Sequence, residues 1–247
     1  MPKEIQIDVR RLVFPLIGGR ESASGFARSC FLGTGFFVSR RGLALTAAHV
    51  VSNLDRVDVR AALPTASGPM TAHNLQWIVP LPESDIAVVR VNTPTSTCFA
   101  SRFESPVMGQ NVETTAIPKS MLSTDPGGKT KVQMRVTKGY VSHGADGWVA
   151  ASFALPKGMS GAPLIVTNPD SQFVAGVFVG QNRGEEIEDQ IEEVTDKSAS
   201  ERHTHVERIS RIEYFARGEL LASFAGFIAP EFGGFNLKDL IMREIAE

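Results

Sequence analysis

Short apolar runs recur along most of the chain, separated by residues that favour turns. The runs are rich in Val, Ile, Phe and Thr and are bounded by Gly, Pro, Asn or Asp; they are LVFPLI, FLGTGFFVS, LALTAAHVV, DIAVVRV, VETTAIP, VQMRVTKGYVS, WVAASFA, APLIVT and QFVAGVFVG. Most are short enough for strands and too short for helices. The pattern therefore predicts an all-β protein built as a barrel or sandwich.

A helical period appears only at the C-terminal end. In FNLKDLIMREIAE the apolar residues fall on one stripe, with charged residues opposite; the stripe holds Leu237, Leu240, Ile241 and Ile245. This spacing predicts an amphipathic helix over residues 236–246. The preceding segment, ERISRIEYFARGELLASFAGF, fits either strands or a short helix.

Two stretches break the strand pattern. Between Val91 and Met108 the chain gains Pro, Ser and Thr, which is typical of a linker between two β units. We place the boundary there and expect units at residues 1–100 and 101–247. From 183 to 203 the chain is a charged run, RGEEIEDQIEEVTDKSASERH. We expect a solvated, partly disordered surface loop inserted in the second unit, with a regulatory or partner-binding loop as the alternative.

Composition and charge narrow the setting. The 247 residues are 43% hydrophobic and 21% charged, with a net charge of -2, so no global field would attract nucleic acid or an anionic membrane. No apolar run has the length of a spanning helix, and the N-terminal MPKEIQIDVRR lacks the uninterrupted apolar region of a secretory signal. Cys30 and Cys98 cannot make a disulfide framework. We expect a cytoplasmic protein, with a single Cys30–Cys98 bridge as an alternative.

Three residues could carry nucleophilic chemistry together. A serine hydroxyl needs an adjacent general base, and the base needs a carboxylate that fixes its tautomer. Ser160 lies between small residues in KGMSGAP, His49 in LALTAAHVV and Asp85 in PESDIAVVRV. Asp55 and Asp58 compete for the orienting role, but they follow His49 closely in a polar stretch. The candidates are therefore His49, Asp85 and Ser160.

The remaining histidines fit surface or turn positions better. His73 and His143 lack the approach of small residues that precedes His49. His203 and His205 could bind a metal, but no third ligand is placed beside them, so no metal site is predicted. A Gly-x-Ser-x-Gly nucleophile elbow is excluded, because Ala162 stands at the second glycine position and the order Ser, Asp, His is absent.

The order His, Asp, Ser and the segments TAAHV, SDIAVV and GMSGAPL resemble those of the trypsin-like, chymotrypsin-fold serine peptidases. GTGFFVSRRGLALTAAHVV is most similar to the HtrA-like and other bacterial branches, and the likeness covers residues 31–181 without a PDZ domain. The resemblance implies two antiparallel six-stranded β-barrels with a C-terminal α-helix. It places His49 and Asp85 in the first barrel and Ser160 in the second, and it implies catalysis without a cofactor.

The resemblance also implies the rest of the site. The backbone N–H groups of Gly158 and Ser160 would form the oxyanion hole, and the primary substrate pocket would be lined by Ala154, Val179 and Gly180. None of the three pocket residues is charged. We therefore expect a preference for small or medium apolar residues before the scissile bond.

The sequence departs from the secreted members of this family at several positions. Met159 stands where an aspartate receives a newly cut N-terminal amine in those proteins, so LIGG at Leu16–Gly19 is expected to be an ordinary strand and turn. Val50 stands where many relatives have a half-cystine, and Cys30 is expected to be a small buried hydrophobe. Control is then expected from loops, a partner or assembly.

The function that follows is a serine endopeptidase acting on a protein or peptide substrate, with a regulatory protein partner and with no nucleic-acid or membrane partner. One alternative is a catalytically weak or inactive barrel that binds peptides. Another is a peptidase recruited to a sensing protein, which cleaves one target or itself on command.

Overall fold

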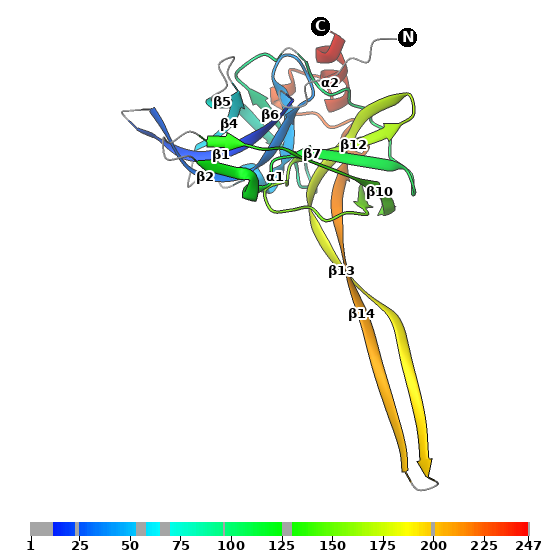
Figure 1. Ribbon diagram of the computed structural model, residues 1–247. Coiled ribbons are helices and arrows are strands. Elements are labelled where there is room, and N and C mark those ends of the chain that lie inside the picture. The colour runs from blue at the N-terminus through cyan, green and yellow to red at the C-terminus, as the bar shows by residue number, and fades with distance from the viewer. Residues whose placement is uncertain are drawn as a thin grey trace, which may run out of the picture.

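The computed structural model describes residues 12–22, 25–52, 58–64, 70–95, 97–124, 130–198 and 201–246. Most of the strands form two closed antiparallel barrels of six strands each, followed by a C-terminal helix (Figure 1). This confirms the fold class expected from the sequence. Among these residues, no helix is both long and apolar enough to cross a membrane.

The first barrel closes in the order β1-β2-β3-β6-β5-β4, with bounds β1 Val13–Ser22, β2 Gly25–Phe37, β3 Leu43–Ala47, β4 Asp58–Pro64, β5 Met70–Pro80 and β6 Ile86–Val91. The second closes in the order β10-β11-β14-β13-β12-β7, with bounds β7 Asn111–Ala116, β10 Arg135–Ala145, β11 Trp148–Ala151, β12 Ala162–Asn168, β13 Ser171–Ser198 and β14 Glu201–Leu220. The other elements are α1 Ala48–Val51, η2 Lys119–Met121, β8 Leu122–Thr124, β9 Thr130–Val132, η3 Leu221–Phe224, η4 Pro230–Phe232 and α2 Leu237–Ala246.

The two barrels share apolar packing. One core cluster fills the second barrel. The other fills the first barrel and extends to outward-facing residues of β12 and β13, which are Ile165, Val174, Val177 and Val179. Strand β3 is buried on both faces, with all five of its residues buried. Its sequence is therefore a continuous apolar run and does not alternate. Any residue carried at this shared face is held by both barrels.

Helix α2 follows the predicted residues closely. The Asn236 side chain accepts the Asp239 backbone N–H at 2.8 Å, which is an N-cap contact. Leu237, Leu240 and Ile241 are buried in the cluster of the first barrel. The chain thus returns to the first barrel after completing the second. The strands of the two barrels are separated between Val91 and Asn111, and the division at residue 100 stays a prediction.

A buried ion pair fixes α2 on the first barrel. Glu244 is 6% exposed. Its carboxylate accepts the Ser39 hydroxyl at 2.7 Å and the Arg90 guanidinium at 2.5 and 2.9 Å. At 100° per residue Glu244 falls between Leu240 and Leu237 within the apolar stripe, so the helical period places this acid on the buried face, where it needs a partner.

The charged run forms a hairpin arm, and the expected surface loop over 183–203 is wrong. Strands β13 and β14 pair from Gly176↔Leu220 to Ser198↔Glu201, and the arm projects from the second barrel (Figure 1). Two of the paired positions carry opposite charges, Glu186↔Arg211 and Asp196↔Arg202. Cross-strand complementarity of this kind favours a ladder. It is visible only once the register is known.

The N-terminal strand and the cysteines test two smaller expectations. Leu16–Gly19 lies within β1 and pairs with β2 and β4, so it is an ordinary strand as predicted. Cys30 and Cys98 are not joined by a disulfide, and Cys30 is exposed, so its expected burial is wrong. The β1–β2 ladder has register shifts at two places, and the face that Cys30 occupies could not be derived from alternation alone.

Candidate functional site

The ends of two neighbouring strands bring His49 and Asp85 together. Strands β3 and β6 are antiparallel, and Ala47↔Ile86 is the last pair of their ladder. His49 lies in α1 directly after β3, and Asp85 lies directly before β6. The Ala48 N–H donates to the Asp85 carbonyl at 2.7 Å. This short contact continues the ladder by one step and fixes both backbones.

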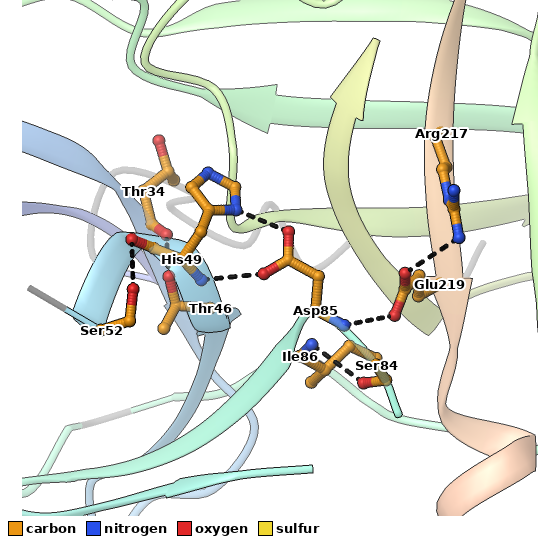
Figure 2. Close-up of polar contacts among 9 residues, drawn as sticks. All are labelled: Thr34, Thr46, His49, Ser52, Ser84, Asp85, Ile86, Arg217 and Glu219. Atoms are coloured by element: carbon orange, nitrogen blue, oxygen red, sulfur yellow. Dashed lines mark hydrogen bonds and ion pairs between the residues drawn. The ribbon is translucent and has the colours of Figure 1, made fainter. Parts of the chain in front are cut away.

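The side chains of His49 and Asp85 form a two-point contact (Figure 2). Asp85 Oδ1 accepts the His49 backbone N–H at 2.8 Å, and Oδ2 lies 2.5 Å from His49 Nδ1. Because an ionised carboxylate can only accept, Nδ1 carries a proton, and in the neutral imidazole the lone pair is therefore on Nε2. The imidazole is 50% exposed, so Nε2 is available to a reacting group.

Ser160 lies in a tight turn that enters β12. Met159 N–H donates to the Pro156 carbonyl at 3.1 Å, and Gly158 has φ +94°, which is the geometry of a type II turn with glycine at its third position. The Gly161 N–H donates to the Phe178 carbonyl on β13 at 2.7 Å. The serine is therefore carried by the second barrel.

The serine turn packs directly on the first barrel. Thr34 on β2 donates its N–H to the Ser160 carbonyl and its hydroxyl to the Gly158 carbonyl, each at 2.9 Å. Gly161 has φ +88°, and a Cβ there would overlap the Thr34 carbonyl and the Thr46 hydroxyl. Thr46 lies three residues before His49 on β3. The turn and the histidine segment therefore lie against each other.

The peptide planes of the turn are fixed by their carbonyls. The Lys157 carbonyl accepts the Lys119 N–H at 2.9 Å, and the Met159 carbonyl accepts the Ala162 N–H at 3.0 Å. In a trans peptide the N–H points opposite to the C=O. The N–H groups of Gly158 and Ser160 thus point away from those two donors, and within the described part of the chain neither has an acceptor. Two oriented backbone donors remain available to a ligand.

The three predicted catalytic residues lie in one region, but hydrogen bonds join only two of them. His49 and Asp85 are joined by hydrogen bonds, whereas none joins His49 to Ser160 among the described residues. In unliganded enzymes such a contact is often long and tightens with substrate. Asp58 is exposed on β4 and pairs with Gly19, and Asp55 lies outside the described residues.

Comparison with known proteins shows the family. A sequence model of the trypsin-like peptidase domain matches residues 33–176, which is more than half of the chain. The chain belongs to the trypsin-like peptidase family. The expected enzyme class, a trypsin-like serine protease, is thereby confirmed.

The solved structure of neuropsin shows the same fold. Neuropsin, a serine protease expressed in the limbic system of mouse brain, superimposes with a TM-score of 0.56 at 12% identity, covering 87% of this chain and 91% of its own. The serine endoprotease from Yersinia pestis gives a TM-score of 0.49 at 19% identity, covering 69% of this chain and 55% of that chain. A search of curated protein sequences found no match.

The predicted pocket residues of this trypsin-like peptidase differ in exposure. Ala154 is exposed, and a Cβ at Gly180 would meet nothing within 4 Å. Val179 is 7% exposed and packs in the core shared by the barrels. The Leu155 N–H donates to the Gln181 side-chain oxygen at 3.0 Å, which ties the segment before the serine turn to β13. The open space near this hydrogen bond lies beside Gly180.

The remaining histidines and acids form no candidate metal site among the described residues. No group of three or more His, Cys, Asp or Glu there could hold a metal ion. His143 is exposed on β10, the surface position expected from the sequence, and its ring packs edge-on against Trp148 and Phe215. The side chains of His203 and His205 lie outside the described part.

Sequence reasoning missed two polar residues of the site. Thr34 holds the serine turn, and Glu219 on β14 accepts the Asp85 backbone N–H at 2.7 Å. The partners of each are more than a hundred positions away in the chain. A signal existed for Glu219: with Arg217 it is one of two charged residues among the apolar and small residues of FARGELL, and a buried acid requires a partner.

Proposed function

We propose that the protein is a serine endopeptidase in which Ser160 is the nucleophile, His49 the general base and Asp85 the group that orients His49. The observation that carries this proposal is the two-point contact between Asp85 and His49, which leaves Nε2 unprotonated beside the segment that packs on the serine turn. A barrel that only binds peptides has no physical requirement for this arrangement.

The reaction would proceed in two halves. Ser160 Oγ attacks the carbonyl carbon of the scissile bond while its proton passes to His49 Nε2. The imidazolium then protonates the leaving amine as the C–N bond breaks, and an ester on Ser160 remains. Water, deprotonated by the same nitrogen, attacks this ester; the C–Oγ bond breaks, the imidazolium returns its proton to Ser160 Oγ, and the carboxylic acid product is released. Asp85 stays ionised and stabilises the imidazolium in both halves.

The N–H groups of Gly158 and Ser160 would hold the developing oxyanion. Their orientation supports this role, because the carbonyls of the two preceding residues are occupied by Lys119 and Ala162. Donors fixed in advance cost no reorganisation during the reaction, and one such donor contributes about 10²–10³ in kcat.

The substrate preference proposed is a small or medium apolar residue before the scissile bond. Ala154 and Gly180 would border the side chain of that residue, and neither offers a charge to Lys or Arg. Regulation by a protein partner is part of the same proposal, since Met159 excludes the ion pair that activates the secreted relatives. These finer points rest on the resemblance of the motifs.

The test is hydrolysis of a peptide library in which the residue before each bond is varied. The native protein should cleave after small or medium apolar residues, and Ser160→Ala and His49→Ala should abolish cleavage. Ser171→Ala and His73→Ala serve as matched controls and should cleave normally. Cleavage that survives Ser160→Ala would overturn the nucleophile assignment, and cleavage after Lys and Arg would overturn the specificity.

A further inference from the structure

Asp85 is held from both barrels. Its carbonyl and both carboxylate oxygens are bound to the His49 segment of the first barrel. Its backbone N–H donates to Glu219 Oε2, on β14 of the second barrel, at 2.7 Å (Figure 2). The barrel that carries Ser160 thus holds the backbone of the residue that orients His49.

Glu219 is itself fixed by its neighbours. The residue is 7% exposed, and its second oxygen, Oε1, accepts Arg217 Nη2 at 3.4 Å. The Arg217 guanidinium lies over the Trp148 ring, 5.4 Å from the centroid. Trp148 is paired with Glu219 in the β11–β14 ladder. These contacts leave the carboxylate one well-defined orientation toward Asp85.

We propose that Glu219 is a positioning residue for catalysis, which sets the place of Asp85 and through it the direction of the His49 imidazole relative to Ser160. The inference rests on the proposed function of the triad. Glu219 acts as an acceptor for the Asp85 N–H, and neither its charge nor its bulk is the feature that matters.

A hollow beside Glu219 determines how the inference must be tested. It has a volume of about 670 Å³, is open to solvent, and is lined by Glu83 and Ser84 as well as by Arg217 and Glu219. Truncation to Ala would let water enter and accept the Asp85 N–H in place of the carboxylate. Glu219→Leu keeps the side-chain bulk without an acceptor, and Glu219→Gln keeps an acceptor oxygen without the charge.

The experiment measures KM and kcat for these two variants. The kcat is expressed per competent site, and the competent sites are counted by fluorophosphonate titration. Glu219→Leu should lower kcat by about 10²-fold, with KM little changed, because only the catalytic geometry is disturbed. Glu219→Gln should stay within a few-fold of the native protein. Glu113, whose carboxylate contacts Lys138 and Gln172 on the second barrel, provides the matched control Glu113→Leu, expected to keep native kcat.

Two kinetic outcomes would overturn the inference. A native kcat per titrated site in Glu219→Leu would mean that Glu219 only stabilises the fold, and equal losses in Leu and Gln would mean that its charge is what matters. A second readout does not need turnover: the NMR signal of the His49 Nδ1 proton should move in Glu219→Leu and stay in place in Glu219→Gln. An unchanged signal in Leu would reject the positioning role, and a protein without turnover that shows the predicted shifts would reject only the peptidase function.

Discussion

The packing of the serine turn on the first barrel predicts the effect of Gly161→Ala. Gly161 has φ +88°, a conformation that costs an alanine about 1–2 kcal/mol. The new Cβ would also overlap the Thr34 carbonyl and the Thr46 hydroxyl, and such overpacking costs about 1–3 kcal/mol. Gly161→Ala should therefore lower the free energy of unfolding by about 2–5 kcal/mol, measured by urea denaturation.

Gly109→Ala is the matched control for this prediction. Gly109 has φ +80°, but a Cβ there would meet nothing within 4 Å, so only the backbone cost of about 1–2 kcal/mol remains. Activity should separate the two variants further. In Gly161→Ala alone, a displacement of Ser160 by about 1 Å should lower kcat/KM by about 10²-fold. Equal losses of stability, within about 0.5 kcal/mol, together with equal activity would refute the proposed packing.

Three further predictions concern other parts of the molecule. Glu244→Ala leaves Arg90 uncompensated in a buried site and should cost about 3–5 kcal/mol in urea denaturation; a loss below about 1 kcal/mol would mean that the pair behaves as an exposed one. Burial raises the pKa of the Cys98 thiol, an effect that a nearby arginine partly offsets. The pKa of Cys98 is then higher in the folded than in the unfolded protein, so the stability that the neutral thiol contributes is lost as pH rises from the unfolded pKa through the folded one. In iodoacetamide labelling followed by peptide mapping, Cys98 should react more slowly than the exposed Cys30. Equal labelling rates would contradict this burial. Thr34→Val removes the hydroxyl that donates to the serine turn and should lower kcat in peptide hydrolysis while folding is retained; an unchanged kcat would show that the N–H of residue 34 suffices.

The parts of the site that could be predicted from the sequence are those that depend on short, continuous segments. The stretch around Ser160 carries its glycines within two residues, and the strand ends before His49 and at Asp85 appear as apolar runs that stop at those residues. Strand length and composition likewise predicted an all-β fold, as a barrel or a sandwich, because a strand buried on both faces is a continuous apolar run. The arrangement in two barrels was implied by the resemblance to the trypsin-like peptidases.

The parts that could not be predicted depend on which strands become neighbours. Thr34 and Glu219 act on residues more than a hundred positions away, and no local pattern specifies such a contact. The hairpin arm could not be predicted from its charged run, because the pairing of β13 with β14, including Glu186↔Arg211 and Asp196↔Arg202, depends on a register that the run does not show. The ion-pair partner of Glu244 could not be predicted for the same reason, since Arg90 lies on another element.

The most direct test of the central claim is intact-mass labelling by a fluorophosphonate, which phosphonylates an activated serine oxygen and releases fluoride. The native protein should gain one adduct, and Ser160→Ala should gain none. His49→Ala should react at least about 10²-fold more slowly, because the general base is lost. An adduct that persists in Ser160→Ala, or a native protein that is never labelled, would contradict the assignment of Ser160 as a nucleophile activated by His49.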